Sequence, residues 1–395
     1  MLIEHTEFDF AHDAEIFAPI PAASAVFLLR GADSSAEPYI SKTANLRRRL
    51  ERLLGAPTER SKRLNLRDQV RQIEYTTTGS DFESGFLLYE LLRDTFPKTY
   101  ADRLRLRFAP LVKLHMENAY PRASVTTRLG RLGGASLYYG PFPSRAMAEQ
   151  FASDSLDFFK MRRCVEDLHP YPQFPGCIYS EMKMCLAPCY KGCTDEEYVN
   201  EVNRVKSYFD SGGESLVREI SAARDQASAN LDFENAAAQH ARIEKLKVLV
   251  GRLPEVTQRI DLLAGVIVQP SATAGCVAFF PIASGLVSSQ IAFPIQPAEH
   301  TKSQSMESRI QAALAASPAS QPRNALEVME HLAMLKRWYF RSRRVGEIFL
   351  ADKDGALPMR RLVRGVSRVY RGERAETDTP GTVTIESPPA KNGLA

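Results

Sequence analysis

Five of the six cysteines of this 395-residue chain lie in one stretch, between Cys164 and Cys193. The first four, Cys164, Cys177, Cys185 and Cys189, follow the spacing C-x12-C-x7-C-x3-C. A group of thiols this dense forms a disulfide framework, a metal site or a set of buried free thiols. The stretch constrains the fold strongly, because the first two alternatives require side chains distant in sequence to meet.

The cellular compartment separates these alternatives. The N-terminus, Met1–Asp13, is acidic and unlike a signal or transit peptide, and no run of eighteen apolar residues predicts a membrane span. We therefore expect a cytoplasmic protein without membrane contact. Structural disulfides are rare in a reducing cytosol, so we interpret the four thiols as ligands of zinc or of an iron–sulfur cluster. Buried free thiols are the alternative.

Composition adds that the chain is globular and has more than one domain. Hydrophobic residues make up 44% and charged residues 25%, which is ordinary for globular proteins. A chain of 395 residues is expected to divide into roughly two to four domains. The net charge of +4 identifies no partner, whereas the distribution of charge is informative.

A basic segment follows the first predicted hairpin. Strands are predicted over 25–29 and 38–41, and a helix over 44–54, whose leucines share one face. Between Lys42 and Arg71 the sequence has ten Lys or Arg residues against three Asp or Glu residues. This excess predicts contacts with a nucleic-acid backbone, with a solvated basic face as the alternative. The candidate DNA contacts are Arg47, Arg48, Arg52, Lys62 and Arg63.

Three side chains at the second strand and the helix after it suit phosphodiester chemistry. Tyr39, Lys42 and Arg49 supply a phenol to activate water and two cations to stabilise developing oxyanion charge. The segment Tyr39–Leu50, with the preceding Ala25–Phe27, resembles the GIY-YIG nuclease signature in the form found in the UvrC family. In this resemblance Tyr39, Lys42 and Arg49 match the family's catalytic tyrosine, lysine and arginine.

The same resemblance implies a divalent metal, Mg or Mn. A downstream helix, 83–93, is similar to the family helix that supplies one glutamate to this metal. The local leucine pattern favours Glu90 as the ligand, with Glu83 as the alternative. Alignment on the Tyr-Ala-Asp-Arg run that follows places the family glutamate near Leu88 or Tyr89 instead.

The cysteine segment resembles the UvrC family in both spacing and neighbours. The resemblance implies a four-iron four-sulfur cluster, with zinc as the alternative. Its four ligands are expected to be Cys164, Cys177, Cys185 and Cys189. Arg162 and Arg163 precede the first ligand and fit an anionic cluster that needs charge compensation. Cys193 and Cys276 are expected not to be ligands.

Two helical patterns joined by a short turn predict an antiparallel helical hairpin over 206–251. The segment Leu231–Ala237 resembles the UVR motif, through which UvrC proteins dock on UvrB. The resemblance implies a UvrB-like partner. The expected contact residues are Leu231, Phe233, Ala236 and Ala237. Packing of the hairpin on its own protein is the alternative.

We expect an α+β multidomain fold. The predicted segments are an extended lead-in (1–20), a GIY-YIG-type mixed α/β domain (21–108), an intermediate domain with the cysteine cluster (109–205), the UVR-like helical hairpin (206–251), a C-terminal mixed α/β region (252–372) and a disordered tail (373–395). In the C-terminal region a helix is predicted over 325–344. Its mixture of cations and aromatic residues indicates a core face with solvated arginines, or a nucleic-acid contact.

Two functions follow from these features. The first is a DNA-repair endonuclease of nucleotide excision repair, which nicks damaged DNA on a complex assembled by UvrA and UvrB. The second is a catalytically impaired DNA-binding adaptor that keeps the metal cluster and the docking hairpin. Phe27, Ser41 and Ala101 favour the second, because they stand where the family motifs have tyrosine, glycine and asparagine.

Overall fold

The computed structural model describes residues 2–33, 35–56, 64–131, 133–297, 303–316 and 322–374. It confirms a mixed α/β, multidomain architecture. The chain divides into two compact units. The first contains Met1–Ala109, Thr127–Leu132 and Asp261–Ala375, and the second contains Pro110–Thr126 and Gly133–Ile260. Residues far apart in the sequence thus share the first unit.

The N-terminal part of the first unit is an antiparallel sheet in the order β1-β4-β2-β3. Its strands are β1 (Glu4–Glu7), β2 (Ala25–Gly31), β3 (Tyr39–Thr43) and β4 (Val70–Thr77). The predicted hairpin of β2 and β3 forms, with Leu29 opposite Tyr39 and Val26 opposite Lys42. The first five residues of β2 are buried, which explains its continuous apolar run.

Helices cover both faces of this sheet. The amphipathic helix α2 (Leu46–Leu54) buries its four leucines in a core shared with β2 and β4, and Asn45 caps its N-terminus. On the other face α3 (Asp81–Thr95) contributes Leu87, Leu88 and Leu91 to a second cluster with β2. The remaining helices here are η1 (Phe10–His12), α1 (Asp13–Phe17) and α4 (Tyr100–Leu104).

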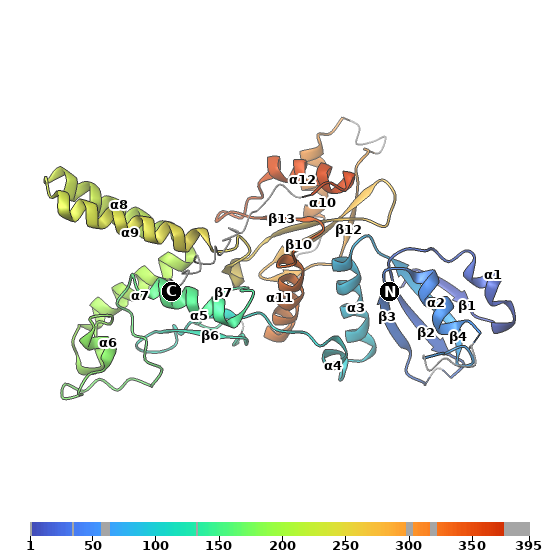
Figure 1. Ribbon diagram of the computed structural model, residues 1–395, viewed down its shortest axis with the longest axis horizontal. Coiled ribbons are helices and arrows are strands. Elements are labelled where there is room, and N and C mark those ends of the chain that lie inside the picture. Colours follow the sequence, from blue (N-terminus) through green and yellow to red (C-terminus); the bar gives the residue numbers. More distant parts are fainter. Residues whose placement is uncertain are drawn as a thin grey trace, which may run out of the picture. The chain divides into compact units, whose positions relative to one another are not determined.

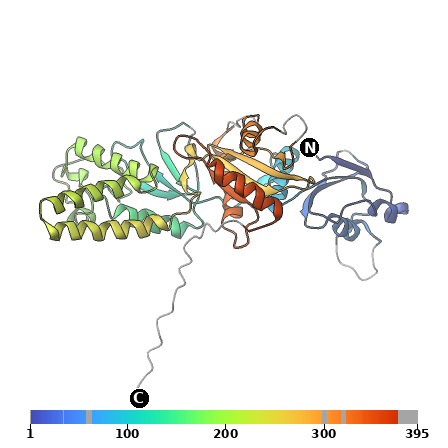
Figure 2. The same ribbon diagram turned by 90° about the horizontal axis from the view of Figure 1, so that it is seen from above.

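The C-terminal part of the first unit is a second antiparallel sheet in the order β11-β10-β9-β13, with β12 also paired to β10. Its strands are β9 (Gly265–Pro270), β10 (Cys276–Ala283), β11 (Leu286–Val287), β12 (Ile291–Pro294) and β13 (Glu347–Leu350). Its helices are η3 (Ile260–Leu262), α10 (Met306–Ala315), α11 (Ala325–Tyr339) and α12 (Met359–Arg371). The helix α12 packs on this sheet through Leu362, Val366 and Val369 (Figure 2).

The helix α11 ends at Tyr339, earlier than the Arg344 predicted from the sequence. Phe340 is its C-cap residue, and the indole N–H of Trp338 donates to the carbonyl of Val345 at 2.9 Å. The chain therefore turns back on the end of the helix before β13 begins. Figure 1 shows α11 beside α3, which lies between α11 and the first sheet.

The second unit has an antiparallel sheet in the order β6-β5-β7-β8 with helices packed against it. Its strands are β5 (Leu111–Leu114), β6 (Ala123–Thr126), β7 (Leu137–Gly140) and β8 (Gln258–Arg259). Its helices are α5 (Arg145–Leu156), α6 (Ile178–Glu181), η2 (Pro188–Tyr190), α7 (Asp195–Asp210), α8 (Glu214–Ala229) and α9 (Phe233–Gly251).

The helices α8 and α9 lie side by side as a helical hairpin (Figure 1). The turn between them is tight, because the backbone N–H of Asp232 donates to the carbonyl of Ala227 at 2.9 Å. Asp232 also caps α9 by accepting a hydrogen bond from the N–H of Asn235 at 3.1 Å. Leu231, at the tip, has a positive φ of 60°.

Among the described helices, none is long and apolar enough to cross a membrane. The predicted disordered tail (373–395) lies outside the described residues from position 375 onwards. The finer domain boundaries predicted from the sequence stay predictions.

Candidate functional site

Two of the three predicted catalytic residues are in direct contact. Tyr39 begins β3, and Arg49 lies in α2, which follows that strand. The guanidinium of Arg49 donates to the phenol oxygen of Tyr39 at 2.9 Å. Both side chains are half-buried, so the pair is braced by the sheet yet reaches solvent. Phe27 is fully buried beneath it, its ring centroid 6.1 Å from that of Tyr39, and serves the core.

The third predicted catalytic residue, Lys42, is held by a carboxylate that the sequence analysis missed. Its ammonium pairs with one oxygen of Asp81 at 2.5 Å, and Arg341 pairs with the other oxygen at 2.6 Å. Burial tends to raise the pKa of Asp81, but Lys42 and Arg341 outweigh it and keep the pKa below its usual value. Asp81 thus joins β3 to the segment that follows α11.

The two glutamates proposed as metal ligands bond to other groups. Glu83 is buried and accepts a hydrogen bond from the backbone N–H of Gly79 at 2.7 Å. Burial raises its pKa to about 7. Glu90 is half-buried, burial raises its pKa, and Ser289 donates to it at 3.3 Å. Within the described ranges, no three His, Cys, Asp or Glu side chains come together as a ready-made metal site.

Tyr89, the alternative position given by alignment, faces α11. It is fully buried, and its hydroxyl donates to Glu330 at 2.8 Å. Tyr100 donates to the second oxygen of Glu330 at 2.7 Å, and Arg93 pairs with Glu327 at 2.6 Å. These contacts fix α3 and α4 to α11. Glu330 is 230 residues or more from both tyrosines in the sequence, so no local pattern could reveal the network.

The candidate DNA-contacting side chains differ in whether they are already bonded within the protein or exposed to solvent. The guanidinium of Arg47 donates to the backbone carbonyls of Ile20 and Ala18, at 2.7 and 3.0 Å. It therefore holds the chain before β2. Arg48 and Arg52 are exposed on α2. Lys62 and Arg63 lie outside the described residues.

Cys164, Cys177 and Cys189 all lie near Cys185, but within the described residues the predicted ligand cysteines do not close into a metal site. All four are free thiols, and Cys189 is buried. Burial above all, together with the neighbouring Cys164, Cys189 and Cys177, raises the pKa of Cys185 to about 11. The backbone N–H of Ala187 donates to the sulfur of Cys185 at 3.3 Å.

A buried arginine adjoins this cysteine group. Arg162 is only 2% exposed. Its guanidinium donates to the carbonyls of Tyr120 and Glu166, at 2.8 and 2.7 Å, and approaches the sulfur of Cys164 at 3.5 Å. No carboxylate in the described part of the chain pairs with it. A buried cation without a counter-ion is costly, so an anionic sulfur group beside it would offset that cost.

The tip of the α8–α9 hairpin exposes apolar side chains. Leu231 is 72% and Phe233 is 67% exposed, whereas Ala236 is half-buried and Ala237 exposed. The buried contacts of the hairpin lie at Leu216 and other aliphatic residues further from the tip. The hairpin therefore leaves a leucine and a phenylalanine in solvent at its tip.

Comparisons with known proteins all give proteins of the UvrC type. Residues 109–208 match the family described as UvrC/Cho excinuclease, middle domain. UvrABC system protein C from Idiomarina loihiensis is 28% identical over 217 residues, which cover 53% of this chain and 34% of that protein. The Acidobacterium capsulatum protein of the same name is 31% identical over 220 residues, covering 55% and 34%. The one from Rickettsia africae is 26% identical over 272 residues, covering 68% and 42%.

The matched region thus spans less than half the length of each of these relatives. No solved structure matches the chain.

Proposed function

This chain belongs to the UvrC family, and we propose that it is a DNA-repair endonuclease subunit, which nicks damaged DNA during nucleotide excision repair. The observation that carries the proposal is the hydrogen bond from Arg49 to the phenol oxygen of Tyr39. Lys42 lies on the same strand but on its other face, beside Asp81. These groups match the catalytic residues expected from the GIY-YIG resemblance.

Each side chain has a distinct role in the proposed hydrolysis. In its ionised form, the phenol oxygen of Tyr39 orients the attacking water and accepts its proton, which leaves the neutral phenol. Arg49 holds that oxygen and binds the scissile phosphate, whose negative charge grows in the transition state. Lys42 is three residues further along β3 and therefore points to the opposite face of the sheet, where it pairs with Asp81. In the proposal it contributes a second cation for the phosphate once that ion pair opens. The exposed Arg48 and Arg52 on α2 contact the adjoining backbone phosphates.

Glu90 is the proposed ligand of Mg or Mn. Its carboxylate keeps coordination capacity, because its one described hydrogen bond is the long contact with Ser289 at 3.3 Å. A divalent ion bound there would supply stabilisation of the leaving oxygen.

A second candidate function is a DNA-binding adaptor without nuclease activity. The ion pair between Lys42 and Asp81 favours this adaptor function, because Asp81 neutralises one of the proposed catalytic cations. The departures at Phe27 and Ser41 point the same way.

A nicking assay separates the two functions. A lesion-bearing duplex labelled on one strand is incubated with the chain, UvrA, UvrB and Mg, and the products are resolved by length. The endonuclease proposal predicts one discrete nicked product that requires the chain. Stable binding to the same complex without a nick, in Mg and in Mn, would establish the adaptor function.

We also propose that Cys164, Cys177, Cys185 and Cys189 hold a four-iron four-sulfur cluster, with zinc as the alternative. The buried Arg162 beside Cys164 supports an anionic centre, and the N–H of Ala187 directed at Cys185 resembles the donors found around cluster sulfurs. The absorption spectrum and iron, sulfide and zinc contents of anaerobically purified protein test this. A colourless, zinc-containing preparation would exclude the iron–sulfur cluster.

Finally, the exposed tip of the α8–α9 hairpin is the proposed docking surface for a UvrB-like partner. Leu231 and Phe233 form its apolar centre, and Ala236 and Ala237 allow close approach of a partner helix.

A further inference from the structure

A cavity of about 130 Å³ lies in the first unit where α3, α4 and α11 meet. Of the predicted catalytic side chains, Lys42 lines the rim of this cavity, whereas Tyr39 and Arg49 do not line it. An apolar cavity of about 150 Å³ in a protein core accepts benzene, so this slightly smaller cavity has close to the space of one aromatic ring and too little for two.

The inner wall of the cavity is aromatic. The ring centroids of Phe82 and Trp338 are 5.3 Å apart, and those of Phe82 and Phe86 are 6.4 Å apart and nearly parallel. All three side chains line the cavity and are buried. Such a wall offers a planar ring extensive stacking or edge contact.

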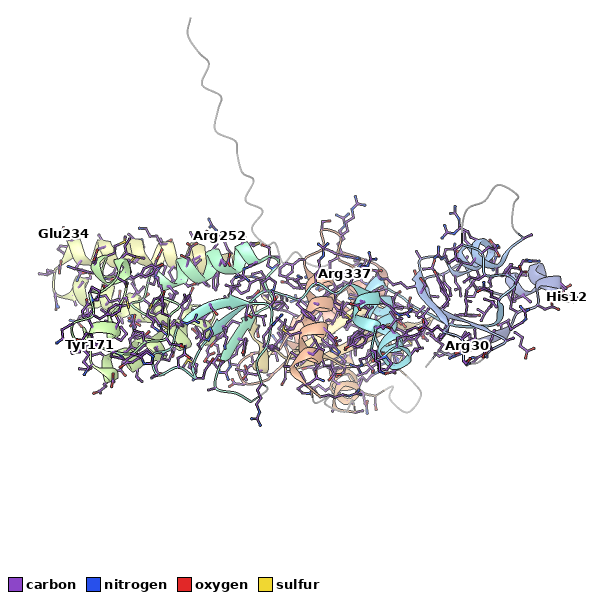
Figure 3. All side chains as sticks on the ribbon, turned by 90° about the horizontal axis from the view of Figure 1, so that it is seen from below. His12, Arg30, Tyr171, Glu234, Arg252 and Arg337 are labelled. Atoms are coloured by element: carbon purple, nitrogen blue, oxygen red, sulfur yellow. The ribbon has the colours of Figure 1, made fainter. Side chains whose placement is uncertain are left out.

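The rim carries a net positive charge. Lys42, Arg103, Arg337 and Arg341 line the cavity together with a single carboxylate, that of Asp81. Asp81 pairs with Lys42 and Arg341, and Arg103 pairs with Glu37, which does not line the cavity, at 2.7 Å. Arg337 is exposed on α11 and has no carboxylate partner in the described part of the chain (Figure 3). An aromatic wall beneath a cationic rim suits a ring that carries a phosphate, which is the chemistry of a nucleotide.

Gly85 keeps the cavity open. It occupies the middle of α3, where glycine is a poor helix former, and it lines the cavity. A Cβ at this position would meet only the ammonium of Lys42, at 3.8 Å. No neighbouring backbone therefore requires glycine there, whereas a large side chain would project into the cavity.

We propose that this cavity binds one unstacked pyrimidine nucleotide of a DNA strand. The base lies against Phe82 and Trp338, and its phosphate pairs with Arg337 and draws Arg341 from Asp81. The size favours a pyrimidine, which has one ring, over a purine. The inference rests on the proposed function only in taking DNA as the ligand.

Trp338 is the single tryptophan of the chain and reports binding directly. The complete chain is titrated with a short 5′-phosphorylated oligodeoxythymidine while its fluorescence is recorded. We expect saturable quenching. Gly85→Leu is expected to weaken the affinity about five- to hundredfold by filling the space of one stacked base. Oligodeoxyadenosine is expected to bind more weakly than oligodeoxythymidine.

A second variant does not depend on the repacking of α3. Arg337→Glu changes an exposed residue, so the fold is expected to persist, and it should weaken binding and lower its salt dependence. Arg360→Glu, at an exposed position of α12, is the charge-matched control and should bind as wild type.

The outcomes distinguish this proposal from the proposed function. Unchanged affinity in both Gly85→Leu and Arg337→Glu, or equal binding of the two oligonucleotides, overturns the pyrimidine site even if the chain nicks DNA. Loss of affinity in both variants, with no nicking by wild type, supports the site and rejects the endonuclease.

Discussion

At the residue scale, Leu231 combines two unfavourable features. Its φ of 60° lies in the left-handed region, which costs a leucine about 1–2 kcal/mol, and its side chain is 72% exposed. Neither feature stabilises the hairpin. Both are explained if the side chain contributes to binding, because the turn then holds a leucine out towards the partner.

Leu231→Gly separates stability from docking. Glycine adopts the left-handed conformation freely, so we expect an unchanged or slightly higher melting temperature. Loss of a leucine that becomes buried on binding, worth about 1.5–3 kcal/mol, should weaken affinity for UvrB about ten- to hundredfold. Calorimetric titration with UvrB measures this. Val248→Ala, an exposed position of α9 away from the tip, is the control. Equal affinity of Leu231→Gly and wild type contradicts docking through the tip.

Arg162→Gln tests whether the buried arginine compensates an anionic cluster. Glutamine keeps one donor but removes the charge beside Cys164, so iron and acid-labile sulfide per chain should fall severalfold. Arg163→Gln is the matched control, because Arg163 is neutralised by Asp157 at 2.8 Å. Circular dichroism checks that both variants fold. Full cluster content in Arg162→Gln, or equal loss in the control, would reject this role.

At the element scale, α11 is the helix on which the first unit depends. It buries Glu330 against Tyr89 and Tyr100 of α3 and α4, and its His331 accepts a hydrogen bond from the backbone N–H of Val287 in β11 at 3.0 Å. Contacts with α11 therefore hold α3 in place, and α3 in turn places Asp81 beside Lys42.

The stability of the first unit should depend on the protonation of His331. Burial is the main cause that lowers its pKa to about 4, from 6.5. As the pH falls, His331 is therefore protonated in the unfolded chain before it is protonated in the folded protein. The stabilisation by neutral His331 is complete above pH 6.5 and is lost as the pH falls towards 4, by about 3 kcal/mol in total.

Urea unfolding followed by Trp338 fluorescence measures this dependence. His331→Asn keeps an acceptor for Val287 but cannot take up a proton, so its unfolding free energy should fall less between pH 6.5 and 4. His5→Asn, at an exposed position of β1, should behave as wild type. An equally steep pH dependence in His331→Asn would show that other groups cause it.

Local elements could be predicted from the sequence, whereas contacts between distant elements could not. The strands β2 and β3 and the helix α2 follow from apolar runs and leucine spacing within a few residues. The end of α11 was predicted wrongly, because the Arg-rich run after Trp338 has helical composition and only the turn to Val345 ends it. Asp81 was missed because its partner Lys42 is 39 residues away.

At the scale of the whole molecule, the first unit joins the first and last parts of the described chain. The N-terminal sheet shares it with the C-terminal sheet, and α3 packs between the N-terminal sheet and α11. The domains predicted in order along the sequence do not show which of these segments pack together. That depends on buried polar contacts such as Tyr89 with Glu330, which no spacing rule identifies.

The proposed part of the Tyr39 phenol in nicking DNA can be measured directly. Single-turnover incision of a lesion-bearing duplex, with UvrA, UvrB and Mg, is measured for wild type, Tyr39→Phe and the control Tyr370→Phe, an exposed tyrosine of α12. Loss of the proton acceptor should slow Tyr39→Phe by about 10²- to 10⁴-fold and leave Tyr370→Phe unchanged. Incision by Tyr39→Phe at the wild-type rate would contradict the account.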